Sequence, residues 1–339
     1  MKTTAIVFDK VNSVILDELQ LPDPTARDLV VENLVSGVSV GTERWAYVGK
    51  RAELTFPNVP GYMGVGRVLE AGGEAQNRGY HPGQMVNYMA SRLNPPHGPN
   101  SWMATHLSHA IVDACIDPDG GFNGHHCERL PEGLDPFDAS LAGLCGVALR
   151  GIEMARIPAG SIVLVVGMGV IGQYAAQVCR LKGAMVAAAD VDDQRLQIAA
   201  ANGAEWTIHS NRENLKDRVA RIAPQGFDII IDTSSIPAVV NTVMPFLKLY
   251  GQFIFQGWYP PPSALDLNVF HMRMPTCYFP CGFSGSAVAT SMRWAKDGKI
   301  NTRNLITHRR RPQDAKEVYE LIARGSEGFL GIVFDWSKP

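Results

Sequence analysis

The chain has 339 residues, 46% hydrophobic and 19% charged, with a formal net charge of −2 at pH 7. That length suits two domains and buries enough apolar surface to fold without disulfides or a structural metal. The near-neutral balance argues against a nucleic-acid-binding surface, which normally carries a basic excess. Residues 161–172, the longest apolar run, are too short and too glycine-rich for a membrane helix.

The first 140 residues predict short strands separated by Gly, Pro, Asn or Asp. The strand-like segments are 3–9, 13–19, 28–40, 64–72 and 83–90. Helical periodicity is poor here. We therefore expect residues 1–140 to form an irregular, mostly antiparallel, barrel-like domain.

Helix and strand begin to alternate near residue 140. Expected helices are 135–155, 170–184 and 192–204, and expected strands are 161–167, 185–191, 228–234 and 251–258. Such alternation predicts a doubly wound parallel sheet over 141–275. Two further helices, 286–300 and 312–325, and a strand at 331–336 predict that residues 276–339 return to the first domain.

A glycine-rich turn joins the expected strand 161–167 to the following helix. Gly167, Gly169 and Gly172 form a G-x-G-x-x-G pattern, and Val170 and Ile171 open the helix. Glycines here allow a tight turn and a close approach of the backbone to a pyrophosphate, and the helix start supplies oriented N–H groups. These five residues are predicted to bind a dinucleotide; a packing turn without a ligand is the alternative.

An acidic residue ends the next expected strand. Asp190 lies at the distance where such folds place a carboxylate against the ribose 2′-hydroxyl. That carboxylate would repel a 2′-phosphate, so NAD is predicted as the cofactor. Arg195 follows closely and could reach a phosphate, which leaves NADP as the alternative.

The order of parts resembles the medium-chain dehydrogenase/reductase superfamily. The resemblance covers nearly the whole chain and rests on "SGVSVGTE" (36–43), "VPGYMGVGRVLEAG" (59–72), "VVGMGVIG" (165–172), "DVDDQRLQIAAANGA" (190–204) and "FDIIIDTS" (227–234). It implies a GroES-like catalytic domain, a Rossmann domain and a return to the catalytic domain. The first of these motifs is locally similar to the bacteriochlorophyllide a dehydrogenase group.

The zinc ligands that the resemblance implies are replaced in this chain. A zinc-dependent relative carries Cys in the first motif, His-Glu in the second and Cys, Asp or Glu before the Rossmann domain. The corresponding residues here are Ser39 and Val40, Tyr62 and Met63, and Gly143 with Cys145 nearby. Hydroxyls are poor zinc ligands and one cysteine cannot hold the ion, so we expect no metal.

The resemblance implies that Tyr62 replaces the metal as the group that donates to the substrate oxygen. Thr42 stands where related enzymes place a hydroxyl of the proton relay, and Glu43 follows at an acidic position. The alternatives are a packed aromatic ring for Tyr62, a turn hydroxyl for Thr42, and an ion pair of Glu43 with Arg44 or Arg67.

The resemblance also implies residues around the two ligands. Thr233, Ser234 and Gly257 are expected near the cofactor. Aromatic residues are expected to line the substrate site, with ordinary packing as the alternative: Trp45, Tyr47, Trp102, Trp258 and Tyr259.

The favoured function is a zinc-independent, NAD-dependent alcohol dehydrogenase or ketone reductase, which transfers hydride between nicotinamide and a secondary alcohol or ketone. The substrate is a small molecule, and the aromatic residues are suited to a large aromatic or apolar one. The alternatives are a quinone or enone reductase, which often uses NADPH, and a nucleotide-binding protein without turnover. The first ten residues show no apolar signal segment, and the six cysteines are scattered, so reduced thiols in the cytoplasm are expected. No membrane or nucleic-acid partner is expected, and a homodimer through the Rossmann edge strands is implied by the resemblance alone.

Overall fold

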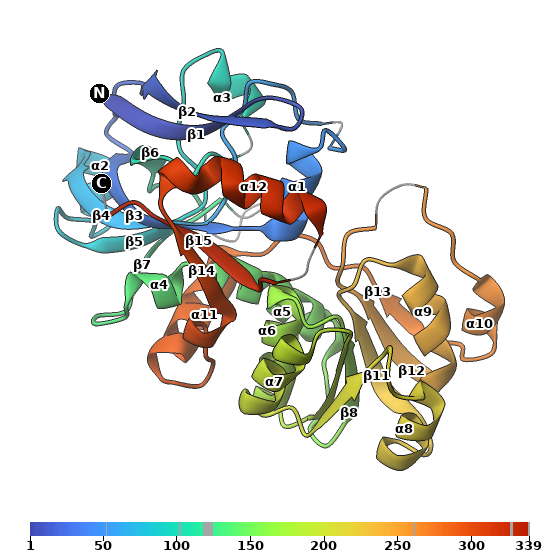
Figure 1. Ribbon diagram of the computed structural model, residues 1–339. Helices are drawn as coiled ribbons and strands as arrows, with labels where there is room; N and C mark the ends of the chain where they lie inside the picture. The colour runs from blue at the N-terminus through green and yellow to red at the C-terminus, as the bar shows by residue number, and fades with distance from the viewer. Residues whose placement is uncertain (52, 102, 118–124, 260–261, 326–327, 338–339) are drawn as a thin grey trace. The chain divides into compact units, whose positions relative to one another are not determined.

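Figure 1 shows the computed structural model, which describes residues 1–339 except 52, 102, 118–124, 260–261, 326–327 and 338–339. The chain divides into two compact units. Unit 1 comprises Met1–Gly143, Phe283–Gly298 and Thr302–Pro339; unit 2 comprises Leu144–Gly282 and Lys299–Asn301. The boundaries expected at 140 and 275 lie slightly before those of the structure.

Unit 1 is built on a mostly antiparallel sheet, as its strand-rich sequence predicts. A β1–β2 hairpin accompanies a seven-stranded sheet in the order β14-β15-β3-β4-β5-β7, with β6 also paired to β3. Only the β14–β15 pair in it is parallel among the described residues. The strands are β1 Lys2–Lys10, β2 Ser13–Gln20, β3 Asp28–Val38, β4 Gly64–Ala71, β5 Met85–Tyr88, β6 His109–Asp113, β7 Cys127–Arg129, β14 Ile306–Arg310 and β15 Gly331–Asp335.

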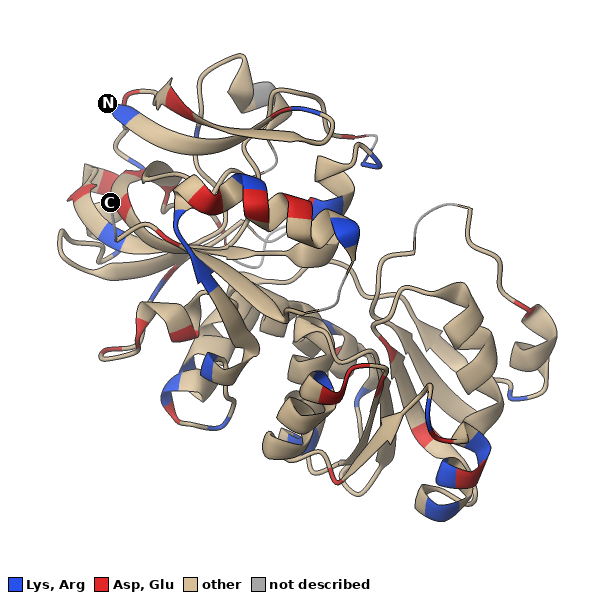
Figure 2. Cartoon of the chain, in the orientation of Figure 1, with Lys and Arg blue, Asp and Glu red and all other residues tan. Residues whose placement is uncertain are grey.

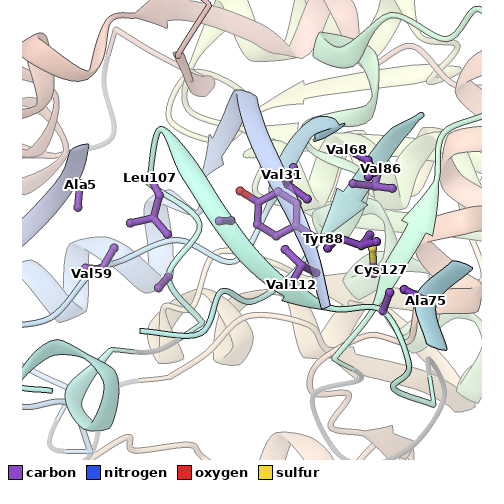
Figure 3. Close-up of a cluster of buried hydrophobic side chains, with 14 of the residues drawn as sticks. Ala5, Val31, Val59, Val68, Ala75, Val86, Tyr88, Leu107, Val112 and Cys127 are labelled. Carbon is purple, nitrogen blue, oxygen red and sulfur yellow. The ribbon is translucent and has the colours of Figure 1, made fainter. Parts of the chain in front are cut away.

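The core of this sheet surrounds Tyr88, a fully buried side chain. Figure 3 shows its ring among Val31 of β3, Val86 of its own strand β5 and Val112 of β6. A Cβ at Gly64 would lie 2.4 Å from the Tyr88 ring, so the glycine makes the space that the ring fills. Burial of this apolar surface is the main stabilising contribution in the unit.

Short helices flank the sheet of unit 1. They are α1 Val40–Tyr47, α2 Gly73–Asn77, α3 His97–Asn100, α4 Pro136–Ala139, η2 Arg303–Leu305, η3 Pro312–Asp314, α11 Gly285–Lys296 and α12 Ala315–Arg324. Helix α12 buries Tyr319 and Ile322 in a core that also contains Phe8 and Phe334. Its outer face carries acidic and basic side chains together, as expected of an amphipathic surface helix (Figure 2).

Unit 2 is a doubly wound α/β fold, which confirms the predicted class. Its six parallel strands follow the order β10-β9-β8-β11-β12-β13. The strands are β8 Ile162–Val166, β9 Met185–Asp190, β10 Trp206–His209, β11 Phe227–Asp232, β12 Leu247–Phe255 and β13 Thr276–Tyr278. The helices are α5 Ala142–Ala155, α6 Val170–Leu181, α7 Asp193–Ala201, α8 Leu215–Ile222, α9 Pro237–Val243, η1 Met244–Phe246 and α10 Leu267–His271.

The strand order explains where a ligand can bind in unit 2. The chain starts at the central strand β8, moves outward through β9 and β10, and then crosses to β11. Ligands of such sheets bind at the carboxyl ends of the strands where the order reverses. In unit 2 the order reverses between β8 and β11, so the carboxyl ends of these two strands mark the expected binding position. No helix in the described part of the chain is long and apolar enough to span a membrane.

Candidate active site

The glycine-rich turn after β8 has the geometry that its pattern requires. Gly167 has φ +86°, a conformation that side chains rarely adopt. A Cβ on Gly172 would lie 1.9 Å from the Gly167 carbonyl oxygen. Both glycines are therefore required by the packing of the turn against the start of α6.

Gly169 has a different environment from the other two glycines. A Cβ added there would have nothing within 4 Å among the described atoms. Gly169 is the N-cap of α6, and Val170 and Ile171 are the first helical residues. The first N–H groups of a helix have no acceptor within the helix, and they carry its positive dipole end. Open space beside these donors fits an incoming phosphate group.

Asp190 ends β9 and orders the same turn. Its Oδ2 accepts a hydrogen bond from the Met168 N–H at 2.5 Å, and its Oδ1 accepts from the N–H groups of Val191 and Asp192 at 2.7 and 3.0 Å. A carboxylate has about four acceptor positions. These three bonds leave capacity for one hydroxyl donor close to the glycine-rich turn.

Thr233 and Ser234 follow β11 and lie beside the turn. The Thr233 hydroxyl donates to the Val166 and Gly167 carbonyl oxygens at 3.1 and 2.6 Å. The Ser234 hydroxyl donates to Asp232 Oδ1 at 2.7 Å. The Gly257 N–H donates to the Asp232 carbonyl at 3.0 Å. The structure thus gathers all three expected residues at the carboxyl ends of β8, β11 and β12.

Asp232 was not among the predicted site residues. It is fully buried, and burial raises the pKa of its carboxyl group. The Tyr259 hydroxyl donates to Asp232 Oδ2, and burial raises the pKa of that tyrosine too. Tyr259 is therefore held by a carboxylate through the group that was expected to face substrate. The neighbouring Trp258 is 42% exposed.

In unit 1, the start of α1 brings three hydroxyl groups together. Ser39 is the N-cap of α1, and Thr42 lies in its first turn. The Tyr62 hydroxyl donates to Ser39 Oγ at 2.5 Å and also has a hydrogen bond with Thr42. Ser39 and Tyr62 are buried, whereas Thr42 is partly exposed. The expected pair Tyr62 and Thr42 is thus in contact.

Burial raises the pKa of Tyr62 to about 12. The hydrogen bonds with Ser39 and Thr42 oppose this rise, and the charge of Glu43 adds to it. Because the hydroxyl stays protonated at neutral pH, it can act as a hydrogen-bond donor. Its ring lies 5.9 Å from the ring of Phe283, which fixes the ring on its other side.

Glu43 is buried rather than paired with an arginine at the surface. Its Oε1 accepts from the Ser39 N–H at 2.7 Å, and its Oε2 contacts His106 Nε2 at 3.0 Å and accepts from the Tyr319 hydroxyl at 2.6 Å. The Arg67 guanidinium instead faces Glu32, with Nη1 and Oε2 4.0 Å apart. Glu43 therefore contacts the hydroxyl cluster through the Ser39 backbone.

The residues at the expected metal positions do not fit zinc. A Cβ on Gly143 would lie 3.1 Å from both Met63 Cγ and Phe283 Cζ, so a thioether and an aromatic ring fill the space beside it. Ser39 and Tyr62 supply only hydroxyls. Among the described residues, no group of three or more His, Cys, Asp or Glu could hold a metal ion. Zinc requires about three nitrogen, sulfur or carboxylate ligands from the protein.

The remaining aromatic residues have different surroundings. The side chain of Tyr47 is buried, its hydroxyl donates to the Asn12 carbonyl at 3.0 Å, and its ring stacks on Tyr319. Trp45 is partly buried beneath the Lys50 ammonium, which lies 4.8 Å from its ring centre. Trp102 lies outside the described residues. A role for these three in substrate binding stays a prediction, and the contacts of Tyr47 give it a packing role.

Several comparisons place this geometry among known proteins. Residues 170–303 match the family described as zinc-binding dehydrogenase. The chain is 26% identical to the 2-desacetyl-2-hydroxyethyl bacteriochlorophyllide A dehydrogenase of Cereibacter sphaeroides, over 99% of each protein. It is 22% identical to L-threonine 3-dehydrogenase of Vibrio cholerae, over 95% of each.

Solved structures show the same fold along the whole chain. An oxidoreductase/dehydrogenase of unknown specificity from Escherichia coli aligns with a TM-score of 0.87 at 18% identity, over 99% of both chains. A zinc-binding dehydrogenase from Sinorhizobium meliloti bound to NADP aligns with a TM-score of 0.83 at 20% identity, over 99% of both. A short chain alcohol dehydrogenase from Escherichia coli, complexed with NADH, aligns with a TM-score of 0.81 at 19% identity, over 98% of this chain and 99% of that one.

Along its whole length the chain is thus similar to dehydrogenases of the medium-chain type, the class that its sequence motifs resemble.

Proposed function

We propose that the protein is a zinc-independent, NAD(H)-dependent oxidoreductase that interconverts a secondary alcohol and a ketone. The observation that carries the proposal is a hydroxyl cluster, in which Ser39 and Tyr62 stand where the resemblance implies metal ligands and Thr42 stands at the position of a proton-relay hydroxyl. A protonated tyrosine can stabilise negative charge on a substrate oxygen by donating a hydrogen bond, so it can replace a metal in this role.

NAD(H) is the proposed cofactor, and when bound it supplies the hydride chemistry. The N–H groups at the start of α6 would hold its pyrophosphate beside the open face of Gly169. Asp190 has capacity for one ribose hydroxyl and a charge that opposes a 2′-phosphate. The two solved relatives differ on this point, since one is bound to NADP and the other to NADH. Asp190 is therefore the residue on which the preference rests.

The proposed proton path uses side chains of unit 1. In ketone reduction, Tyr62 donates its proton to the substrate oxygen as the alcohol forms. Ser39 and Thr42 are hydrogen-bonded to Tyr62, so they can return a proton to it. Thr42 is the partly exposed member, and it supplies the end of the path toward solvent. Alcohol oxidation runs through the same groups in the opposite direction.

The proposed substrate class is a secondary alcohol next to an aromatic or apolar group. The names of two relatives include a hydroxyethyl substituent and threonine, and each contains a secondary hydroxyl. Trp258 supplies an exposed aromatic surface after β12 and is proposed to contact the apolar part of such a substrate. The six cysteines form no disulfide in the described part of the chain, which supports the proposal of a cytoplasmic protein. A homodimer is proposed from the superfamily alone.

The test uses 1-phenylethanol and acetophenone as probes, because they carry the hydroxyethyl and acetyl groups on a single aromatic ring. Protein freed of metal by chelation should reduce acetophenone with NADH and oxidise 1-phenylethanol with NAD. Activity that appears only after zinc is added would contradict the zinc-independent mechanism. Reduction of an enone carbon–carbon bond, with acetophenone left unchanged, would favour the quinone or enone reductase alternative.

A further inference from the structure

A buried polar network lies behind the hydroxyl cluster of unit 1. Glu43 and His106 are almost completely buried, and their Oε2 and Nε2 atoms are 3.0 Å apart. The other ring nitrogen of His106, Nδ1, lies 2.7 Å from Ser36 Oγ. The Trp336 indole N–H donates to the same serine oxygen at 2.9 Å. Tyr319 completes the network by donating to Glu43.

Counting donors and acceptors favours one arrangement of protons in this network. Trp336 can only donate, so Ser36 Oγ accepts from it. The serine proton then has a partner if it is donated to His106 Nδ1, the other polar atom bonded to Ser36 Oγ. In this arrangement His106 carries its proton on Nε2 and donates it to Glu43 Oε2. With the proton on Nε2, each of the donors named in this network has an acceptor, which is the condition for a stable buried network.

His106 also touches the turn that carries Tyr62. Gly61 has φ +93°, and a Cβ there would lie 2.9 Å from two carbon atoms of the His106 ring. The backbone N–H of His106 donates to the Pro60 carbonyl at 3.3 Å. On its other side, His106 holds Glu43, whose second oxygen accepts from the Ser39 N–H. One imidazole therefore contacts both segments that meet in the Tyr62–Ser39 hydrogen bond.

Ser36, His106 and Glu43 contact one another in the sequence hydroxyl, imidazole, carboxylate, which is also the arrangement of a catalytic triad. Two observations argue against a nucleophilic serine. Ser36 is fully buried, and its oxygen accepts the Trp336 indole N–H. A substrate carbonyl could not reach it without opening the core. The arrangement is suited to holding neighbouring backbone in place.

We propose that His106 is a positioning residue for Tyr62. Its neutral Nε2–H tautomer fixes Glu43, and its ring supports the Gly61–Tyr62 turn, so that it sets the geometry of the Tyr62–Ser39 contact. The effect on turnover rests on the proposed function, in which Tyr62 donates to substrate. The effect on the environment of Tyr62 does not, and it can be measured without any substrate.

Two substitutions separate the contacts of His106. In His106→Gln, the side-chain amide nitrogen can take the place of Nε2 and donate to Glu43. In His106→Asn, the shorter amide lies near the place of Nδ1 and can reach only Ser36. The Asn variant should lower kcat for acetophenone reduction by about 10²-fold, the scale for a misplacement of about 1 Å. KM and the affinity for NADH should be unchanged, and the Gln variant should keep kcat close to that of the native protein.

Nuclear magnetic resonance of the full-length protein supplies the readout that a merely structural role would not change. The ¹³Cζ signal of labelled Tyr62, assigned with Tyr62→Phe, should move in His106→Asn and keep its native position in His106→Gln. In the native protein, His106 should show a single Nε2–H tautomer whose proton exchanges slowly with water. An Nδ1–H tautomer, or equal effects of the two variants on the Tyr62 signal, would overturn the proposal.

A third substitution, in Ser36, applies if His106→Asn does not fold. Ser36→Ala removes the donor to Nδ1 and should also move the Tyr62 signal; an unmoved signal would refute the positioning role. Different measurements test the proposed function and the positioning role, so the failure of one can be told from the failure of the other. Full activity of Tyr62→Phe would reject Tyr62 as the donor, whereas the Tyr62 signal would still report whether His106 sets its position.

Discussion

Tyr62→Phe tests the hydroxyl that is proposed to replace the metal. The substitution removes one oxygen atom and keeps the ring, whose centre lies 5.9 Å from that of Phe283. Packing should therefore be preserved, while Ser39 Oγ loses the donor at 2.5 Å. Loss of one hydrogen bond of this kind costs about 1 kcal/mol of folding stability.

The effect on catalysis should be larger than the effect on stability. Removing one donor to a developing oxyanion typically lowers kcat by about 10²-fold, which corresponds to about 2.7 kcal/mol in the transition state. The assay is steady-state reduction of acetophenone by NADH. The dissociation constant of NADH, measured by fluorescence titration, should not change, because the residues proposed to hold the cofactor lie in unit 2.

Tyr88→Phe provides a matched control. The Tyr88 hydroxyl is buried and has no hydrogen-bond partner among the described residues, so its removal takes away an unsatisfied polar group. This variant should keep native kcat and be at least as stable as the native protein. If Tyr62→Phe also keeps native kcat, Tyr62 is only part of the packing and the proposed donor is wrong.

The remaining predictions concern the cofactor, the metal and pH. Asp190→Ala should weaken NADH binding more than NADPH binding in fluorescence titrations, and tighter binding of NADPH by the native protein would contradict the NAD preference. Gly172→Ala should abolish NADH binding, because its Cβ would lie 1.9 Å from the Gly167 carbonyl; native affinity would refute this geometry. Elemental analysis should find no stoichiometric zinc in active protein. Burial raises the pKa of Tyr62 to about 12 and also raises that of Tyr319. Since these groups lose protons more readily when unfolded, their contribution to stability should be complete below pH 10 and fall as the pH rises from about 10 to 12. Denaturant unfolding at a series of pH values measures this, and a flat profile would contradict it.

The sequence predicts the fold of unit 2 well because its signals are local. A continuous apolar run before Gly167 is typical of a strand buried on both faces, and Gly167 itself has a φ of +86° that few other residues can adopt. Asp190 could be identified from its place at the end of a strand. Asp232 carries the same signal, because it ends the apolar run of β11, but its contact with Tyr259 joins two separate segments.

The hydroxyl cluster was only partly predictable. The superfamily pattern identifies Tyr62 and Thr42, but the strand expected over 28–40 ends at Val38, and a helix begins at Val40. β-Branched residues such as Val40 favour strands, and this preference was overridden by the Glu43 carboxylate, which accepts a hydrogen bond from the Ser39 N–H at the helix start. Ser39 thereby becomes the N-cap that presents its hydroxyl to Tyr62.

His106 carries no signal of its own in the sequence. It follows a turn in which Met103 and Ala104 have positive φ, and its partners Glu43 and Ser36 come from distant parts of the chain. Its importance depends on long-range contacts and on the direction of each hydrogen bond. A lone histidine in an apolar segment is therefore uninformative until the fold shows that one ring nitrogen meets a buried carboxylate and the other a buried hydroxyl. In this protein that arrangement connects the start of α1 to the Gly61–Tyr62 turn, so the residue that orders the proposed donor lies in neither motif.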